Sequence, residues 1–160
     1  MQMPTPTDEH RKLHRLAGTW VGEETLEPSP WGPGGPATGR LSGQVALDGM
    51  FVLSDYVEER DGNVNYRGHG VFGWDAGSKT VVWYWFDSMG DAPQGPARGS
   101  WDGEELVLRS VSPRAQGRYT YRFHGNDRYE FRLENSFDGG RSWVKFMEGT
   151  YLRTANTSAR

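Results

Sequence analysis

Ten short runs of alternating apolar and polar residues dominate this chain and constrain its fold more than any other feature. They fall near residues 19–27, 37–47, 51–60, 64–74, 80–88, 96–101, 104–112, 117–124, 128–136 and 143–153. A period of two is that of a β-strand with one buried face. Starts spaced by roughly 8 to 12 residues are typical of a sandwich or a barrel. The pattern therefore predicts an all-β protein.

Short turn sequences separate most of these runs. They are Asp48-Gly49, Asp61-Gly62-Asn63, Asp75-Ala76-Gly77, Asp102-Gly103, Gly125-Asn126-Asp127 and Asp138-Gly139-Gly140. Asp, Asn and Gly tolerate the backbone angles of tight hairpin turns, so links this short predict antiparallel pairing of sequential strands. The one long connection, EPSPWGPGGPATG, predicts a loop or lid over one end.

The alternation also indicates which side of the sheet is dry. In RYEFRLEN, Tyr129, Phe131 and Leu133 face one way and the charged residues face the other. In GRYTYRFH the same holds for Tyr119 and Tyr121 with Phe123. Ten strands with one aromatic face and no helices to cover it would most simply close on themselves, which also removes unpaired edges. We expect an antiparallel up-and-down β-barrel wide enough to hold a ligand.

One short helix is expected before the barrel. Thr7 or Asp8 serves as the N-cap, Leu13 and Leu16 lie on one face, and Gly18 ends the helix near residue 17. At 160 residues the chain fits one domain, 1–160, with a helix at about 8–17 and a barrel at about 18–153.

The stretch SFDGGRSW, residues 136–143, matches the Asp-box of sialidase propellers. A propeller needs repeated blades, and no second copy of the motif exists in the chain. We interpret it as a hairpin connector.

Charge and composition exclude several classes of function. A formal net charge of −3 and the lack of a basic run argue against a nucleic-acid surface. The chain has no cysteine, which excludes disulfides, zinc-thiolate sites and thiol catalysis. Because no signal-like or membrane-spanning apolar stretch is present, we expect a soluble, cytoplasmic protein that does not bind membranes.

Several motifs resemble known families. The opening LAGTWVGEE resembles the G-x-W signature of lipocalins and related calycins. In those proteins a helix or 3₁₀ turn closes the barrel and the Trp plugs that end. The segments ATGRLSGQVALDGMFVLSDY, YRGHGVFGWDAGSKTVVWYWFDSMG and SFDGGRSWVKFMEGTYLR resemble the bacterial family known as domain of unknown function 1579, over about residues 10–153.

This resemblance implies a lipocalin-like barrel and no particular substrate. Nitrobindins, which are haem proteins with a similar barrel and a similar GTW opening, are a more distant resemblance. Their proximal His lies close to the C-terminus, whereas the last His here is His124.

Two carboxylates are candidates for the barrel interior. In MFVLSDYVEE, Asp55 shares parity with Phe51 and Leu53, and in TVVWYWFDS, Asp87 shares parity with Trp83 and Trp85. A buried carboxylate needs a partner, for which Arg40, His69, Tyr119 and Tyr121 are candidates. The alternative is that Asp87 caps the following turn while Asp55 pairs with an Arg at the rim.

Two orientations stay open at this stage. His69, between Gly68 and Gly70, lies on the face of Arg67 unless a bulge at one of these glycines turns it inward. Glu148 faces inward if Val144 and Phe146 do, and outward if Trp143, Lys145, Met147 and Tyr151 form the inner set.

These observations favour a protein that binds a small, largely apolar or amphipathic molecule in an aromatic-lined cavity. The predicted ligand-binding residues are Trp20, Arg40, Phe51, Asp55, His69, Trp83, Trp85, Asp87, Tyr119, Tyr121 and Phe131. One alternative is an enzyme that uses Asp55, Asp87 and His69 as acids and bases. Another is haem binding as in nitrobindins. Binding without catalysis is favoured, and no metal site or cofactor is predicted. A homodimer through Trp31 or Trp101 is a further hypothesis.

Overall fold

The computed structural model describes residues 1–155 and contains one short helix followed by ten β-strands. The helix α1 spans Asp8–Leu13 and continues into a 3₁₀ turn at His14–Leu16. The strands in chain order are β1 Gly18–Leu26, β2 Gly35–Ala46, β3 Phe51–Arg60, β4 Asn63–Asp75, β5 Thr80–Asp87, β6 Ala97–Asp102, β7 Glu105–Val111, β8 Gln116–Phe123, β9 Arg128–Ser136 and β10 Val144–Arg153. A second 3₁₀ turn, Leu47–Gly49, joins β2 to β3.

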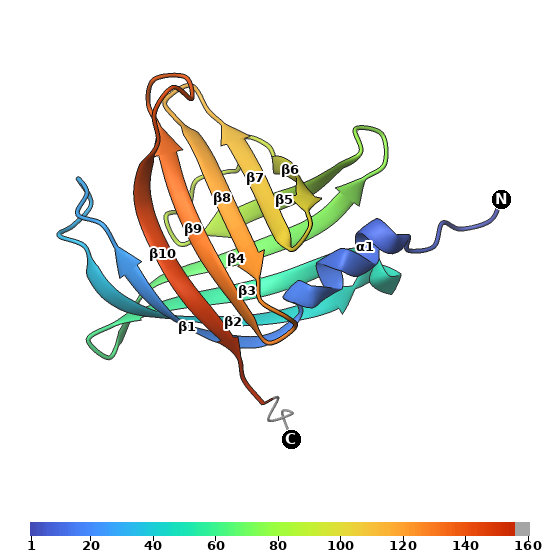
Figure 1. Cartoon of the computed structure of the whole chain (residues 1–160), viewed down its shortest axis with the longest axis horizontal. Coiled ribbons are helices and arrows are strands. Elements are labelled where there is room, and N and C mark those ends of the chain that lie inside the picture. Colours follow the sequence, from blue (N-terminus) through green and yellow to red (C-terminus); the bar gives the residue numbers. More distant parts are fainter. Residues whose placement is uncertain (156–160) are drawn as a thin grey trace.

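Each strand pairs antiparallel with its neighbour in sequence, and β1 pairs with β10, so the sheet closes into a barrel (Figure 1). All ten predicted strands are present, with each bound within two residues of its expected place. The prediction of an up-and-down barrel is therefore confirmed, because hairpin chemistry and alternation agree along the whole chain.

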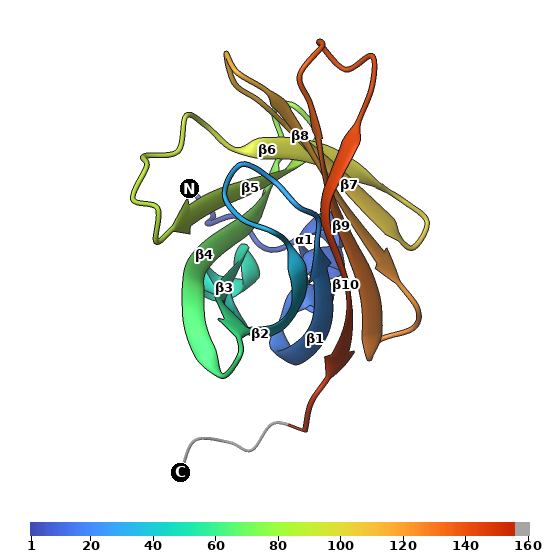
Figure 2. The ribbon, with the colours of Figure 1, turned by 90° about the vertical axis from the view of Figure 1, so that its left-hand side faces the viewer.

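The helix closes one end of the barrel. In Figure 2, which looks into the barrel, α1 lies at the far end. Trp20 on β1 is 1 % exposed, and its indole N–H donates to the carbonyl of Leu16 at 3.3 Å. The guanidinium of Arg153 lies 4.2 Å from the Trp20 ring centroid and donates to the carbonyl of Ala17 at 2.6 Å. These contacts make this end a packed plug.

The opposite end carries the long β1–β2 connection and the β3–β4, β5–β6, β7–β8 and β9–β10 links. SFDGGRSW forms the β9–β10 link, as expected of a hairpin connector. Hydrogen bonds from the Ser142 hydroxyl and backbone N–H lower the pKa of Asp138 to about 2. Gly139 and Gly140 take φ values of 76° and 91°, which only glycine adopts without strain. Trp31, in the β1–β2 connection, packs edge-on against Phe146 at 6.3 Å.

No helix within residues 1–155 is long and apolar enough to cross a membrane.

Candidate functional site

The interior of the barrel holds a cavity of about 660 Å³ on the side away from the Trp20 plug. Half of the residues that line it are aromatic. Its polar lining residues are Ser54, Glu58, Asp87, Asp91, Arg114 and Asn135. A volume of this size lies within the range of small-molecule sites, which are apolar pockets with a few polar groups.

Stacked and edge-on rings form the deeper wall of the cavity. Trp83 stacks on Phe72 with centroids 5.5 Å apart and meets Tyr119 edge-on at 4.8 Å. Tyr121 packs against Phe131 at 4.9 Å. Ring pairs at these distances are favourable beyond the area they bury. The wall is therefore held in shape before any ligand arrives.

Two glycines on β4 make room for the indole rings. A side chain at Gly68 would collide with the ring of Trp85, and one at Gly70 would lie 2.7 Å from Nε1 of Trp83. Gly68 and Gly70 are thus the inward positions of YRGHGVFG, so His69 between them points outward. Among the described residues, Trp83 Nε1 is buried without a hydrogen-bond partner.

Asp87 lies where β5 reaches the open end. Its Oδ2 accepts hydrogen bonds from the Tyr66 hydroxyl at 2.7 Å and from Trp85 Nε1 at 3.1 Å. Its Oδ1 accepts the backbone N–H of Met89 at 3.0 Å. Asp87 therefore both caps the turn and lines the cavity, so both roles considered for this residue hold, whereas Asp55 pairs with His69 and not with an Arg. Burial, together with the bond to Asp87, raises the pKa of Tyr66 well above its ordinary value.

A second carboxyl group, that of Glu24 on β1, lies behind the cavity wall. It is 2 % exposed. The Tyr56 hydroxyl donates to it at 2.7 Å and the Tyr151 hydroxyl at 2.8 Å. Burial raises the pKa of Glu24 to about 7, although both hydroxyl bonds oppose the shift. Gly39 faces this group, and any side chain there would collide with Oε1 of Glu24.

A third carboxylate, Glu58 on β3, is 6 % exposed and lines the cavity. Within residues 1–155 its contacts go to one oxygen. Oε1 accepts from Arg60 Nε at 3.3 Å and from Asn65 Nδ2 at 3.5 Å. Both distances are long for hydrogen bonds. Oε2 is therefore the oxygen left for another partner.

Of the eleven predicted ligand-binding residues, six line this cavity. They are Trp83, Trp85, Asp87, Tyr119, Tyr121 and Phe131. Trp20 lies in the plug at the closed end and is not among the lining residues. That these side chains contact a ligand stays a prediction.

The other four predicted residues lie on the outer surface. The inward placement of Phe51 and Asp55 is therefore wrong, and of the two orientations left open for His69 the outward one is observed. The exposed Arg40 donates from Nε to the half-buried Glu59 at 3.1 Å. The Phe51 ring packs over Gly73 of the neighbouring strand β4, on the outer face of the sheet. Asp55 and His69 pair with each other at 2.8 Å, with side chains 76 % and 43 % exposed.

The wrong placement of Phe51 and Asp55 has one cause, which is the parity of β3. Both faces of MFVLSDYVEE carry apolar residues, so alternation alone could not choose between them. The inner set is Val52, Ser54, Tyr56 and Glu58. Asp55 and Asp87 consequently lie on opposite faces of the sheet, and the proposed set of Asp55, Asp87 and His69 does not come together.

A β-bulge settles the orientation of Glu148. The β9–β10 register shifts between Lys145 and Met147, so Phe146 and Met147 both line the cavity. Glu148 points outward, where it accepts from Lys145 at 2.8 Å. A strict period of two therefore fails here, and neither sequence alternative was right throughout.

Sequence reasoning missed the carboxylates Glu24 and Glu58 and the tyrosines Tyr56, Tyr66 and Tyr151. A signal existed for Glu24, because it shares parity with the inward Trp20 on β1. Tyr151 was named only as a member of one of the two sets that stayed open. Tyr56 and Glu58 were hidden by the wrong parity of β3.

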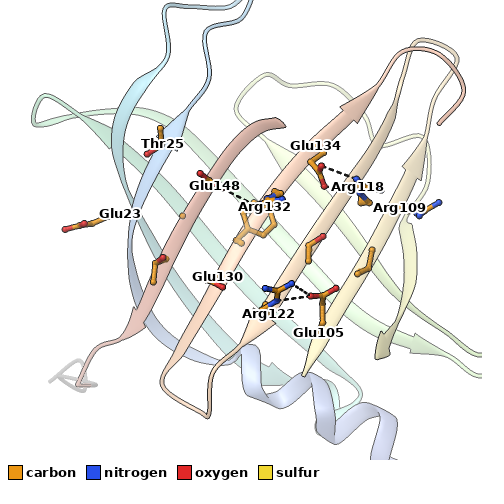
Figure 3. Close-up of a pocket in the computed structure, with 15 residues that line it drawn as sticks. Glu23, Thr25, Glu105, Arg109, Arg118, Arg122, Glu130, Arg132, Glu134 and Glu148 are labelled. Carbon is orange, nitrogen blue, oxygen red and sulfur yellow. Dashed lines mark hydrogen bonds and ion pairs between the residues drawn. The ribbon is translucent and has the colours of Figure 1, made fainter. Parts of the chain in front are cut away.

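A second concave region of about 700 Å³ lies on the outer face of β7 to β10 and β1, and Figure 3 shows its charged side chains. Arg118 donates to Glu134 through two bonds of 3.0 Å, and Arg122 donates to Glu105 at 3.0 Å. Arg132 lies 3.6 Å from Glu148. Since these arginines are matched by glutamates on adjacent strands, the groove has the character of a solvated, ion-paired sheet face.

The cavity does not fit haem ligation by histidine. None of the four histidines lines it. His14 contacts the carbonyl of Gly49, His69 pairs with Asp55, and His124 pairs with Glu130 on the outside. The Trp101 ring, one of the two sites suggested for a homodimer contact, is partly buried against the core, with its centroid 5.8 Å from that of Phe123. The homodimer stays a hypothesis.

Solved structures with the same architecture exist. One is the S-type phycobiliprotein lyase CPES from Guillardia theta, with a TM-score of 0.67, 10 % identity, and coverage of 94 % of this chain and 99 % of that one. Another is Rv2717c from M. tuberculosis, with a TM-score of 0.69, 14 % identity, and coverage of 93 % and 99 %. At such identities the likeness concerns the fold alone.

No curated protein matches the chain. The sequence model of the family described as "Protein of unknown function (DUF1579)" matches residues 5–153, nearly the whole chain. The protein therefore belongs to this family.

Proposed function

We propose that the protein binds one small, largely apolar molecule inside its barrel. The observation that carries the proposal is the aromatic-walled cavity of about 660 Å³ between the Trp20 plug and the open end. A packed barrel would fill this space with side chains, because protein interiors are close-packed and empty volume costs stability. A void of this size with prearranged walls is typical of a ligand site.

Two further features support binding rather than catalysis. The aromatic rings pack with centroids 4.8 to 5.5 Å apart, so they are already held in place and offer flat apolar surface to a ligand. The acids and bases of the enzyme hypothesis lie on opposite faces of the wall. The lyase CPES, named for its action on phycobiliproteins, has the same fold and is consistent with the proposal.

Two adjacent residues of β2 allow a matched test. Leu41 lines the cavity, whereas Ser42 next to it is exposed on the outer face. Titration of the neutral dye Nile red should give a saturable blue-shifted emission with the wild-type protein. Leu41→Trp should weaken binding by about tenfold or more because the indole fills the cavity. Ser42→Trp should leave the affinity unchanged.

The proposal is wrong if neither variant alters dye binding, since the dye would then bind elsewhere. Native mass spectrometry of the purified protein is a complementary measurement. A stoichiometric released molecule would name the chemical class of the natural ligand.

A further inference from the structure

The charged groups around the cavity are unbalanced. Glu58, Asp87 and Asp91 line it, and Glu24 lies directly behind Tyr56 and Tyr151. Asp91 and Arg114 are both exposed at the rim, which leaves Arg60 beside Glu58 against the carboxyl groups of Glu58, Asp87 and Glu24. A carboxylate removed from water is costly unless a cation or several donors compensate it. The cavity therefore has an uncompensated negative character.

Three tyrosine hydroxyls beside these carboxylates already donate their protons. Tyr56 and Tyr151 donate their single hydroxyl protons to Glu24, and Tyr66 donates to Asp87. A tyrosine hydroxyl has one proton to give and lone pairs to accept with. What these three oxygens can still offer to the cavity is acceptor capacity. Oε2 of Glu58 adds an acceptor that has no donor within residues 1–155.

Aromatic rings stand beside these acceptors. Tyr56 lies 6.0 Å from Tyr66 and 6.1 Å from Trp85, measured between ring centroids. All three rings line the cavity, and Tyr66 and Trp85 both bond to Asp87. The faces of Trp and Tyr rings attract cations, most strongly where water is excluded. Acceptors, carboxylates and rings thus favour the same kind of ligand group.

We propose that the molecule held in the cavity carries a protonated amine on its apolar body, and that this ammonium group lies among Glu58, Asp87 and the rings of Tyr56, Tyr66 and Trp85. The inference rests on the proposed function, since it names the chemical class of that ligand. The ammonium supplies donors and a positive charge next to Oε2 of Glu58 and the carboxylate of Asp87. A carboxylated ligand of the same size would add a negative charge to this cluster.

Three naphthalene derivatives of similar shape and different charge test whether the cavity prefers a cationic ligand. Naphthylmethylamine is cationic, naphthalenemethanol neutral and naphthoic acid anionic at about pH 7.5. Isothermal titration calorimetry with the full chain should show the amine binding about tenfold or more tightly than the alcohol, and the acid binding more weakly than either.

Two isosteric variants test the residues. Glu58→Gln and Asp87→Asn should each lower the affinity for the amine by about fivefold or more, while the affinity for the alcohol stays within about twofold of the wild-type value. Retained binding of the alcohol also establishes that the variant cavity is intact. Glu105→Gln, on the outer face, is the matched control and should leave the amine affinity unchanged.

The outcomes distinguish this inference from the function on which it rests. The ammonium assignment is overturned if the alcohol binds the wild-type protein as tightly as the amine does, or if both variants lose affinity for the amine and the alcohol equally. Either result leaves the proposal of a binding cavity intact. If none of the three probes nor Nile red binds the wild-type protein, both the assignment and the proposed function are wrong.

Discussion

The two walls of this barrel carry carboxylates that are stabilised in different ways. On the outer face, Glu105 and Glu134 pair with arginines of β8, and water reaches most of these groups. On the inner side, Glu24 is bound by two tyrosine hydroxyls and has no cation in direct contact within residues 1–155. Its pKa is raised to about 7, chiefly by burial.

This difference indicates on which face of the sheet a charged group still lacks a partner. An outer ion pair has already neutralised its charge and gains little from a further partner. An inner carboxylate without a countercharge lowers the stability of the folded protein. Glu58 is the inner carboxylate that lines the cavity with an oxygen left for another partner, as is expected where a ligand rather than the fold completes the site.

The largest expected effect comes from removing both donors to Glu24. The double variant Tyr56→Phe with Tyr151→Phe leaves the carboxylate buried without hydrogen bonds. We expect the free energy of unfolding to fall by about 4 kcal/mol at about pH 8, measured by urea denaturation. The loss should be smaller at about pH 5, because Glu24 is then protonated. If the free energy of unfolding fell no more than it does on breaking an outer arginine–glutamate pair, the proposed difference between the two faces of the sheet would be wrong.

The pH dependence of stability should reveal Glu24 itself. Its pKa is higher in the folded state, about 7, than its ordinary value of 4.5. The folded protein therefore binds more protons than the unfolded chain between these values, and stability falls as pH rises through this window. The contribution is about 3 kcal/mol. Urea unfolding of wild type and Glu24→Gln across this range should show a flatter profile for the variant, and an identical profile would contradict the assignment.

Two glycines of β4, one on each face of the sheet, test the cavity by steric effects. Gly68→Ala forces the Trp85 ring to move into the cavity, so Nile red affinity should fall by about fivefold or more. Gly73→Ala, on the outer face, meets the ring of Phe51, which is only half-buried and can shift. Dye affinity of that variant should match wild type. Equal effects of both substitutions would indicate a general loss of fold.

The smallest effect is expected on the outer face. Arg122→Met removes the partner of Glu105, and water reaches both side chains, of which Arg122 is exposed and Glu105 half-buried. The free energy of unfolding should change by about 0.5 kcal/mol or less, and less still at high salt. A loss of several kcal/mol in urea denaturation would mean that the outer pairs hold the barrel together.

The strands could be predicted closely because several local signals agree. Turn residues such as Asp102-Gly103 fix where strands end, and the aromatic alternation of β8 and β9 fixes their inner faces. The helix was expected to be longer, but it becomes a 3₁₀ turn at His14–Leu16, where the last turn of a helix commonly tightens.

The site could be predicted only in part, because side-chain orientation depends on pairing. Trp83, Trp85 and Asp87 were placed correctly, since β5 has one clearly aromatic parity. Asp55 was misplaced because both faces of β3 are apolar. The clusters around Glu24 and Glu58 join residues far apart in the chain, such as Glu24 and Tyr151. No local pattern reports such a contact.

The central claim is that ligands enter the aromatic cavity and leave the outer face untouched. Indole N–H signals in a nitrogen–proton correlation spectrum test it directly, with Trp→Phe variants to assign the seven tryptophans. During titration with naphthylmethylamine, we predict saturable shifts of Trp83 and Trp85. Trp143, whose ring packs 4.3 Å from the Arg118 guanidinium, should not move. Shifts at Trp143 with Trp83 and Trp85 unchanged would contradict the account.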